Sequence, residues 1–140
     1  MKIDLDALVG QGASGVYRCA PLAPGEAPPP AREIDLRKAR DKGAFLAAFA
    51  RTLGFPEYFG HNWDAFYDCL GDIEGARLVL LLRGASAFAR AEPEEFGAAL
   101  DTLADAVQLW RETGRSLLVA VELEAPVLAP ELPEISVRPA

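Results

Sequence analysis

The spacing of apolar side chains predicts that strands and helices alternate through the middle of the chain. Residues 78–82 (Leu-Val-Leu-Leu-Leu) form an uninterrupted apolar run between two arginines, which is typical of a strand covered on both faces. From Pro93 onward, apolar residues recur at intervals of three and four, which predicts one long helix ending at Gly114. The same reasoning predicts strands at about 32–36 and 117–121, helices from Lys42 to Leu53 and from Trp63 to about Leu70, and a brief helix near 86–90.

Residues at the ends of these segments support the predicted helix boundaries. Asp41 and Asn62 each stand directly before a helix, where a side-chain oxygen can accept a hydrogen bond from a free backbone N–H. Gly54 and Gly71 follow the last apolar positions, where glycine readily adopts the left-handed conformation that ends a helix.

The order of these elements predicts the fold class. A strand, two helices, a strand, one or two helices and a final strand follow one another. Helical connections join strands in parallel, and such crossovers are right-handed. We therefore expect a small α/β domain in which helices pack on a three-stranded parallel sheet. The 140 residues suit one domain, with a core at about 31–123.

The two ends of the chain differ in composition from this core. Nine of the eleven prolines fall within 21–30 and 126–139, and proline-dense stretches do not form regular helices or ladders. We expect residues 1–30 to be an N-terminal extension and residues 124–140 to be a proline-containing C-terminal tail. Two short apolar stretches on either side of residues 10–15 predict a β-hairpin within the extension.

Residues 10–15, Gly-Gln-Gly-Ala-Ser-Gly, match the G-x-G-x-x-G pattern of dinucleotide-binding proteins. That pattern binds a pyrophosphate only where a helix starts at its last glycines. Here residues 16–19 (Val-Tyr-Arg-Cys) favour a strand, and a proline-rich segment follows. We interpret the sequence as a glycine-rich turn and expect no cofactor.

Composition and charge argue against several classes of function. Fourteen Lys and Arg against twenty-one Asp and Glu give a net charge of −7, which disfavours direct binding of nucleic acid. Two cysteines and one histidine are too few for a disulfide framework or a His-rich metal centre. No apolar run approaches the ~18 residues of a membrane span, and the acidic start lacks the pattern of a signal peptide. We expect a cytoplasmic protein that is monomeric when free, holds no metal and does not bind a membrane.

The negative charge is concentrated in one segment. Between Gly54 and Glu74 there are five acidic residues and no Lys or Arg, so this segment carries −5 of the net −7. On a helix of about 100° per residue, Asp64, Asp68 and Asp72 fall on one side, away from the apolar stripe. Like charges four residues apart weaken a helix slightly, so this acidic ridge (Asp64, Asp68 and Asp72) invites a functional explanation.

Three interpretations of the ridge are open at this point. It is an ordinary solvated face, since surface helices often carry acids. Its residues Asp64 and Asp68 form a cation site with Glu57 and His61, although ligands for Ca²⁺ or Mg²⁺ usually come from a loop folded around the ion. Or it is a contact surface for a protein with a basic cleft, bordered by the exposed hydroxyl of Tyr67.

A hydrolase that uses Asp64, Asp68 and His61 is a further alternative. The two carboxylates lie on one helix face, but the sequence has no nucleophile elbow, H-E-x-x-H or P-loop pattern. We therefore expect that the protein is not an enzyme.

The segment 55–70 resembles the signature of the barstar family, small intracellular inhibitors of barnase-type ribonucleases. Its residues, Phe-Pro-Glu-Tyr-Phe-Gly-His-Asn-Trp-Asp-Ala-Phe-Tyr-Asp-Cys-Leu, match the family pattern Leu-Pro-Glu-Tyr-Tyr-Gly-x-Asn-x-Asp-Ala-Leu-aromatic-Asp-Cys-Leu almost without a break. The predicted order of elements from about 33 to 121 also fits the family. This chain departs from a well-known family member at Tyr67, where that protein has tryptophan, and at His61, where it has glutamate.

The resemblance implies a function and a set of site residues. In the family, the second helix and the loop before it fill the active-site cleft of the ribonuclease, and the residue at the position of Asp68 takes the place of a substrate phosphate. The expected partner is a basic ribonuclease or nuclease toxin in a one-to-one complex, so that the chain acts as a ribonuclease inhibitor or immunity protein. The alternative is a protein–protein interaction module of the same fold with a non-nuclease partner. On this basis we expect the partner-binding residues to be Tyr58, Asn62, Asp64, Tyr67, Asp68 and, near the end of the long helix, Glu112.

Overall fold

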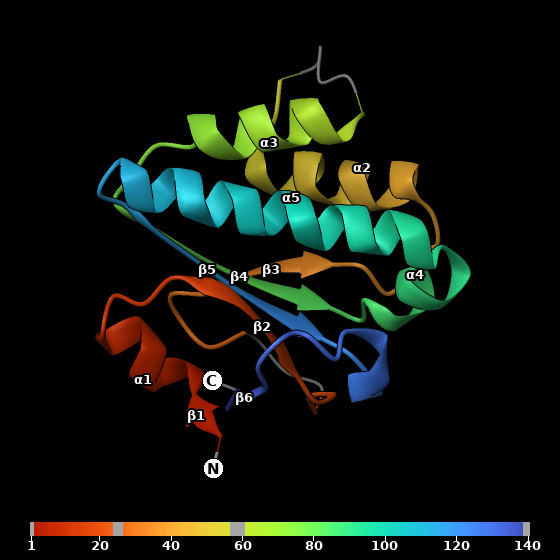
Figure 1. Ribbon diagram of the computed structural model, residues 1–140, viewed down its shortest axis with the longest axis horizontal. Coiled ribbons are helices and arrows are strands. Elements are labelled where there is room, and N and C mark those ends of the chain that lie inside the picture. Colours follow the sequence, from red (N-terminus) through yellow and green to blue (C-terminus); the bar gives the residue numbers. More distant parts are fainter. Residues whose placement is uncertain (1, 24–26, 57–60, 139–140) are drawn as a thin grey trace.

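The computed structural model describes residues 2–23, 27–56 and 61–138 (Figure 1). The strands and helices predicted between residues 32 and 121 are all present. No helix in the described ranges is long and apolar enough to span a membrane. In chain order the elements are β1 (Ile3–Asp4), α1 (Leu5–Gly10), β2 (Gly15–Cys19), β3 (Arg32–Asp35), α2 (Lys42–Leu53), α3 (Trp63–Asp72), β4 (Arg77–Arg83), α4 (Ser86–Ala91), α5 (Pro93–Glu112), β5 (Ser116–Glu122), the 3₁₀ helix η1 (Pro126–Leu128) and β6 (Ile135–Ser136).

The main sheet is parallel and has the strand order β2-β5-β4-β3. Leu80 of β4 pairs with Val119 of β5, and Leu82 of β4 pairs with Ile34 of β3. This arrangement confirms the predicted α/β class, with helices packed on a parallel sheet. Among the residues that the structure describes, this sheet has four strands where the sequence predicted three, because β2 pairs along the free side of β5.

The N-terminal extension does not form the expected β-hairpin. Leu5 and Leu8 lie three residues apart and are both buried, so this stretch forms helix α1 with one apolar face against the sheet. Gly12 has a φ of +66° in the turn after α1, and Gly15 starts β2. Residues 10–15 therefore include a glycine-rich turn, as predicted, but the strand that follows pairs in parallel with β5.

Both faces of the sheet are covered, which explains the uninterrupted apolar run in β4. Leu80 and Leu82 belong to the larger core beneath α2, α3, α4 and α5, whereas Val79 and Leu81 belong to a smaller core beneath α1. Figure 1 shows the four helices on one side of the sheet and α1, β1 and β6 on the other. A strand buried on both faces has no position that favours a polar side chain.

The first and last strands lie side by side, on the side of the sheet away from α3 (Figure 1). β1 and β6 pair in parallel, with Ile3 opposite Ile135. An ion pair of 2.6 Å joins Asp4 to Arg138. The proline-containing tail is therefore packed against the N-terminal extension.

Helix α3 continues through Gly71, where the sequence predicted its end. A Cβ at Gly71 would lie 2.8 Å from Cδ2 of Leu109 in α5, so the glycine lets the two helices approach closely. The helix ends instead at Asp72. There, Arg115 donates hydrogen bonds to the carbonyl oxygens of Gly71 and Ile73 over 3.3 and 2.9 Å, which satisfies acceptors at the helix end.

Candidate partner-binding surface

The acidic ridge lies on the exposed side of α3. Asp64, Asp68 and Asp72 are exposed, whereas Phe66 and Leu70 on the other side of the helix are fully buried. Within the part of the chain that the structure describes, none of the three ridge carboxylates forms a hydrogen bond or an ion pair. The ridge is therefore available to cations of another molecule.

The charge of the ridge acts on a neighbouring thiol. Burial, together with the carboxylates of Asp72 and Asp68, raises the pKa of the Cys69 thiol. Helix α3 contains no Lys or Arg, so the negative charge is not neutralised within the helix.

The beginning of α3 is fixed by Asn62. Its Oδ1 accepts a hydrogen bond from the backbone N–H of Ala65 over 2.8 Å, which is the predicted N-cap. His61 before it has a left-handed φ of 52° and leads the chain into the helix. Asn62 therefore orients the helical turn that carries Asp64.

A groove of about 350 Å³ lies between α3 and α5. Asp64 and Tyr67 line it from α3, and Glu112 lines it from α5. The structure thus brings together three of the residues that the sequence analysis proposed for partner binding. Tyr67 is half-buried and packs against the core, and Asp68 lies one turn further along the ridge than Asp64.

Asp105 is a further candidate that the sequence analysis did not identify. It is exposed and lines the α5 wall of the groove, opposite Asp64. The sequence does contain a pattern that points to Asp105, because Asp101, Asp105 and Glu112 follow one another at intervals of four and seven residues. Such intervals place acidic residues on one side of a helix. The groove therefore has acidic residues on both walls.

Two residues named in the sequence analysis, Glu57 and Tyr58, lie outside the described residues. The expected contact of Tyr58 with a partner therefore remains a prediction. Among residues 2–23, 27–56 and 61–138, no group of three His, Cys, Asp or Glu is arranged to hold a metal ion.

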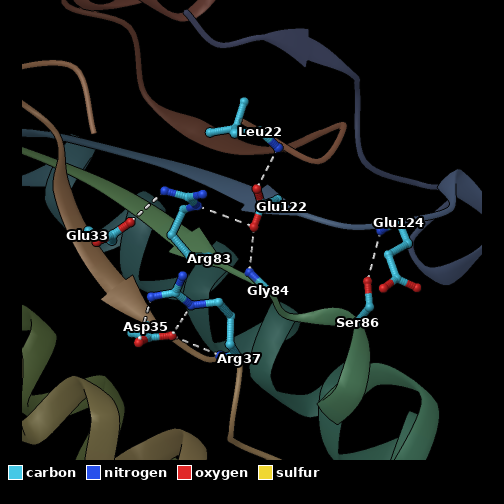
Figure 2. Close-up of polar contacts among 9 residues, drawn as sticks. All are labelled: Leu22, Glu33, Asp35, Arg37, Arg83, Gly84, Ser86, Glu122 and Glu124. Carbon is cyan, nitrogen blue, oxygen red and sulfur yellow. Dashed lines mark hydrogen bonds and ion pairs between the residues drawn. The ribbon is translucent and has the colours of Figure 1, made fainter. Parts of the chain in front are cut away.

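A second cluster of charged residues lies at the carboxyl ends of β4 and β5 (Figure 2). Arg83 is buried and donates hydrogen bonds to Glu33 over 2.7 Å and to Glu122 over 3.3 Å. Glu122 also accepts hydrogen bonds from the backbone N–H groups of Gly84 and Leu22, each over 2.7 Å. These bonds attach the segment after β2 to the ends of the two central strands, so we assign the cluster a structural role.

Comparison with known proteins gives one family. Residues 30–122 match the family described as Barstar (barnase inhibitor). The matched residues run from just before β3 to the end of β5 and include both walls of the groove. No curated protein matches the chain.

Proposed function

This chain belongs to the barstar family, whose members inhibit barnase-type ribonucleases, and we propose that it blocks the basic active-site cleft of a ribonuclease with α3 and the loop before it. The observation that carries this proposal is the acidic ridge. Three carboxylates are exposed along one helix, and no described residue supplies them with a cation. Such a surface complements a cleft that is basic because it binds phosphate.

Asp68 takes the place of a substrate phosphate in this proposal. It lies in the middle of the ridge, between Asp64 and Asp72. A carboxylate fixed on a helix satisfies the cations of the cleft, but it offers neither the leaving group nor the 2′-hydroxyl that RNA cleavage requires. Inhibition therefore requires no chemistry by this chain.

The groove extends the binding surface from α3 towards α5. A guanidinium of the ribonuclease that enters it would meet Asp64 on one wall and Asp105 and Glu112 on the other. The ring of Tyr67 would offer that cation an aromatic face. The family resemblance further implies a contact between Tyr58 and the enzyme, and Asn62 contributes by fixing the first turn of α3.

The concentrated charge also promotes encounter with the partner. The segment 54–74 carries −5, which attracts a basic ribonuclease over a distance set by the ionic strength. We propose that the two proteins form a one-to-one complex in the cytoplasm, where the chain protects the cell as an immunity protein against a nuclease toxin or restrains a ribonuclease of the cell itself.

Isothermal titration against small basic ribonucleases tests the proposal, with Asp68→Ala as the diagnostic variant. We expect the wild type to bind and to inhibit RNA cleavage. Loss of Asp68 should reduce affinity more than about a hundredfold, because it leaves cations of the cleft buried without a partner. Asp6→Ala is the matched control, since Asp6 is an exposed aspartate on α1, across the sheet from α3. Equal binding by the Asp68→Ala and Asp6→Ala variants would contradict the proposal.

A further inference from the structure

Glu95 of α5 holds the first residue of α3. Its Oε2 accepts a hydrogen bond from the indole Nε1–H of Trp63 over 3.1 Å. The Nζ of Lys42, the first residue of α2, lies 4.0 Å from the same oxygen and 5.5 Å from the centroid of the indole ring. One carboxylate therefore contacts residues from the starts of two other helices.

The three helices α2, α3 and α5 all begin at the same end of the helical layer (Figure 1). Glu95 lies in the first turn of α5, and Lys42 and Trp63 are the first residues of α2 and α3. The N-terminal end of a helix carries a partial positive charge, so a carboxylate is stabilised where three such ends meet. This explains why an acidic side chain suits the position of Glu95.

The hydrogen bond to Glu95 completes the fixation of the Trp63 side chain. The indole ring packs edge-on against Phe45, with centroids 5.7 Å apart, and against Phe66, with centroids 5.9 Å apart. Trp63 also lines the groove next to Asp64. A change in the orientation of Trp63 would therefore move the turn from which Asp64 faces the groove.

We propose that Glu95 is a positioning residue of the inhibitory surface. It is not one of the residues that line the groove, and it acts by fixing, through Trp63, the first turn of α3. This inference rests on the proposed function, because its consequence is the affinity for a ribonuclease. The property that matters is the hydrogen-bond acceptor at Glu95, not its negative charge.

Three variants separate these two properties. Glu95→Ala removes the acceptor and the charge, whereas Glu95→Gln removes the charge and keeps an oxygen that accepts from Trp63. Glu94→Ala is the matched control, because Glu94 is exposed in the same turn of α5 and has no polar partner among the described residues.

Affinity for a small basic ribonuclease, measured by isothermal titration, gives the first readout. We expect Glu95→Ala to weaken binding about five- to tenfold, as loss of one hydrogen bond does. Glu95→Gln and Glu94→Ala should stay within about twofold of the wild type. Equal losses for Glu95→Ala and Glu95→Gln would show that charge is the cause and would overturn the proposal, as would wild-type affinity of Glu95→Ala.

A double-mutant cycle with Trp63→Phe gives the second readout. Phenylalanine keeps a ring at this position but has no N–H, so Glu95→Ala should have no further effect on affinity in that background. A full loss caused by Glu95→Ala in the Trp63→Phe background would contradict a route through Trp63.

Nuclear magnetic resonance of the free protein tests the link without a partner. The chain has two tryptophans and therefore two indole N–H signals. Glu95→Ala should shift the Trp63 indole signal and the backbone amide signal of Asp64, and Glu94→Ala should shift neither. Absence of ribonuclease binding by the wild type would refute the proposed function. Unshifted signals in Glu95→Ala would refute the positioning role of Glu95, whatever the wild type binds.

Discussion

The indole N–H of Trp110 donates a hydrogen bond to the backbone carbonyl oxygen of Leu70 over 3.0 Å, and both residues are fully buried. This bond joins the last part of α5 to the second half of α3. The guanidinium of Arg115 lies 4.2 Å from the centroid of the same indole ring and also caps the end of α3. Helix α3 is therefore fixed at both ends, by Trp110 at one and by Trp63 at the other. A surface that is already rigid loses less conformational freedom when it binds.

Trp110→Phe should destabilise the protein substantially. The substitution leaves the buried carbonyl oxygen of Leu70 without its donor and opens a cavity beneath Arg115. We expect the free energy of unfolding to fall by about 2–4 kcal/mol. Urea unfolding measures this, with Trp63→Phe as the control. Trp63 is only half-buried, so Trp63→Phe should lower the free energy of unfolding by about 1 kcal/mol. Similar losses for the two variants would contradict a larger contribution of the buried Trp110 than of the half-buried Trp63 to the free energy of unfolding.

Asp105→Asn should weaken ribonuclease binding, whereas Asp101→Asn should not. Both substitutions remove one negative charge from an exposed position of α5, so their effect on the long-range field is nearly the same. Only Asp105 lines the groove. We expect about a fivefold loss of affinity for Asp105→Asn and less than twofold for Asp101→Asn, measured by titration calorimetry. A groove that makes no contact with the partner would instead give two small and equal effects.

Glu122→Gln should destabilise the fold without a direct effect on the ridge. Within the described ranges, the groups bonded to the Glu122 carboxylate are Leu22, Arg83 and Gly84, and all are donors, so the new amide NH₂ would face at least one donor. Breaking such a buried ion pair costs about 3 kcal/mol or more. The control is Glu124→Gln, since Glu124 pairs with Arg90 at an exposed position and the pair should contribute under about 1 kcal/mol. Chemical unfolding of both variants measures the difference, and a Glu122→Gln variant as stable as the control would refute this role.

Stability should fall at alkaline pH because of Cys19. Burial, and next the carboxylate of Glu122, raise the pKa of the Cys19 thiol from 9.0 to about 12. The unfolded chain therefore releases this proton at lower pH than the folded protein does. The protonated Cys19 thiol therefore makes its full contribution to the free energy of unfolding below pH 9. This contribution is lost as the pH rises from about 9 to 12.

Urea unfolding from about pH 8 to 10.5 tests this dependence. At about pH 10.5 the Cys19 thiol should account for a loss of about 2 kcal/mol. The Cys19→Ala variant should show a smaller fall over the same range, because the remaining titrating groups are common to both proteins. Parallel curves for the two proteins would show that Cys19 is not the cause.

The elements that carry the ridge could be predicted from the sequence because their determinants are local. Asp41 and Asn62 cap α2 and α3 as expected, each through a hydrogen bond to a backbone N–H three residues later. The exposure of Asp68 followed from its angular distance from Phe66 and Leu70 on the helix.

The parts that the sequence analysis missed depend on contacts between distant segments. The stretch around Leu5 and Leu8 is too short to separate a helix from a strand by its pattern, and the sheet that buries it includes a strand more than a hundred residues later. The groove depends on how closely α5 approaches α3, which is set by Gly71 and Trp110. For this reason it was not apparent that Asp105 and Asp64 line the same groove, although the acidic spacing along α5 was visible.

The parallel pairing of β1 with β6 determines where a tag or a surface anchor can be attached to the protein. Ile3 and Ile135 are neighbours across that pair, and β1 and β6 lie on the side of the sheet opposite the ridge helix (Figure 1). An affinity tag, a fluorescent fusion or a sensor-chip anchor joined at either end would leave the acidic helix pointing into solution. Since β1 and β6 are paired, anchors beside both strands can share one support, and we expect the immobilised protein to bind as well as the dissolved one does.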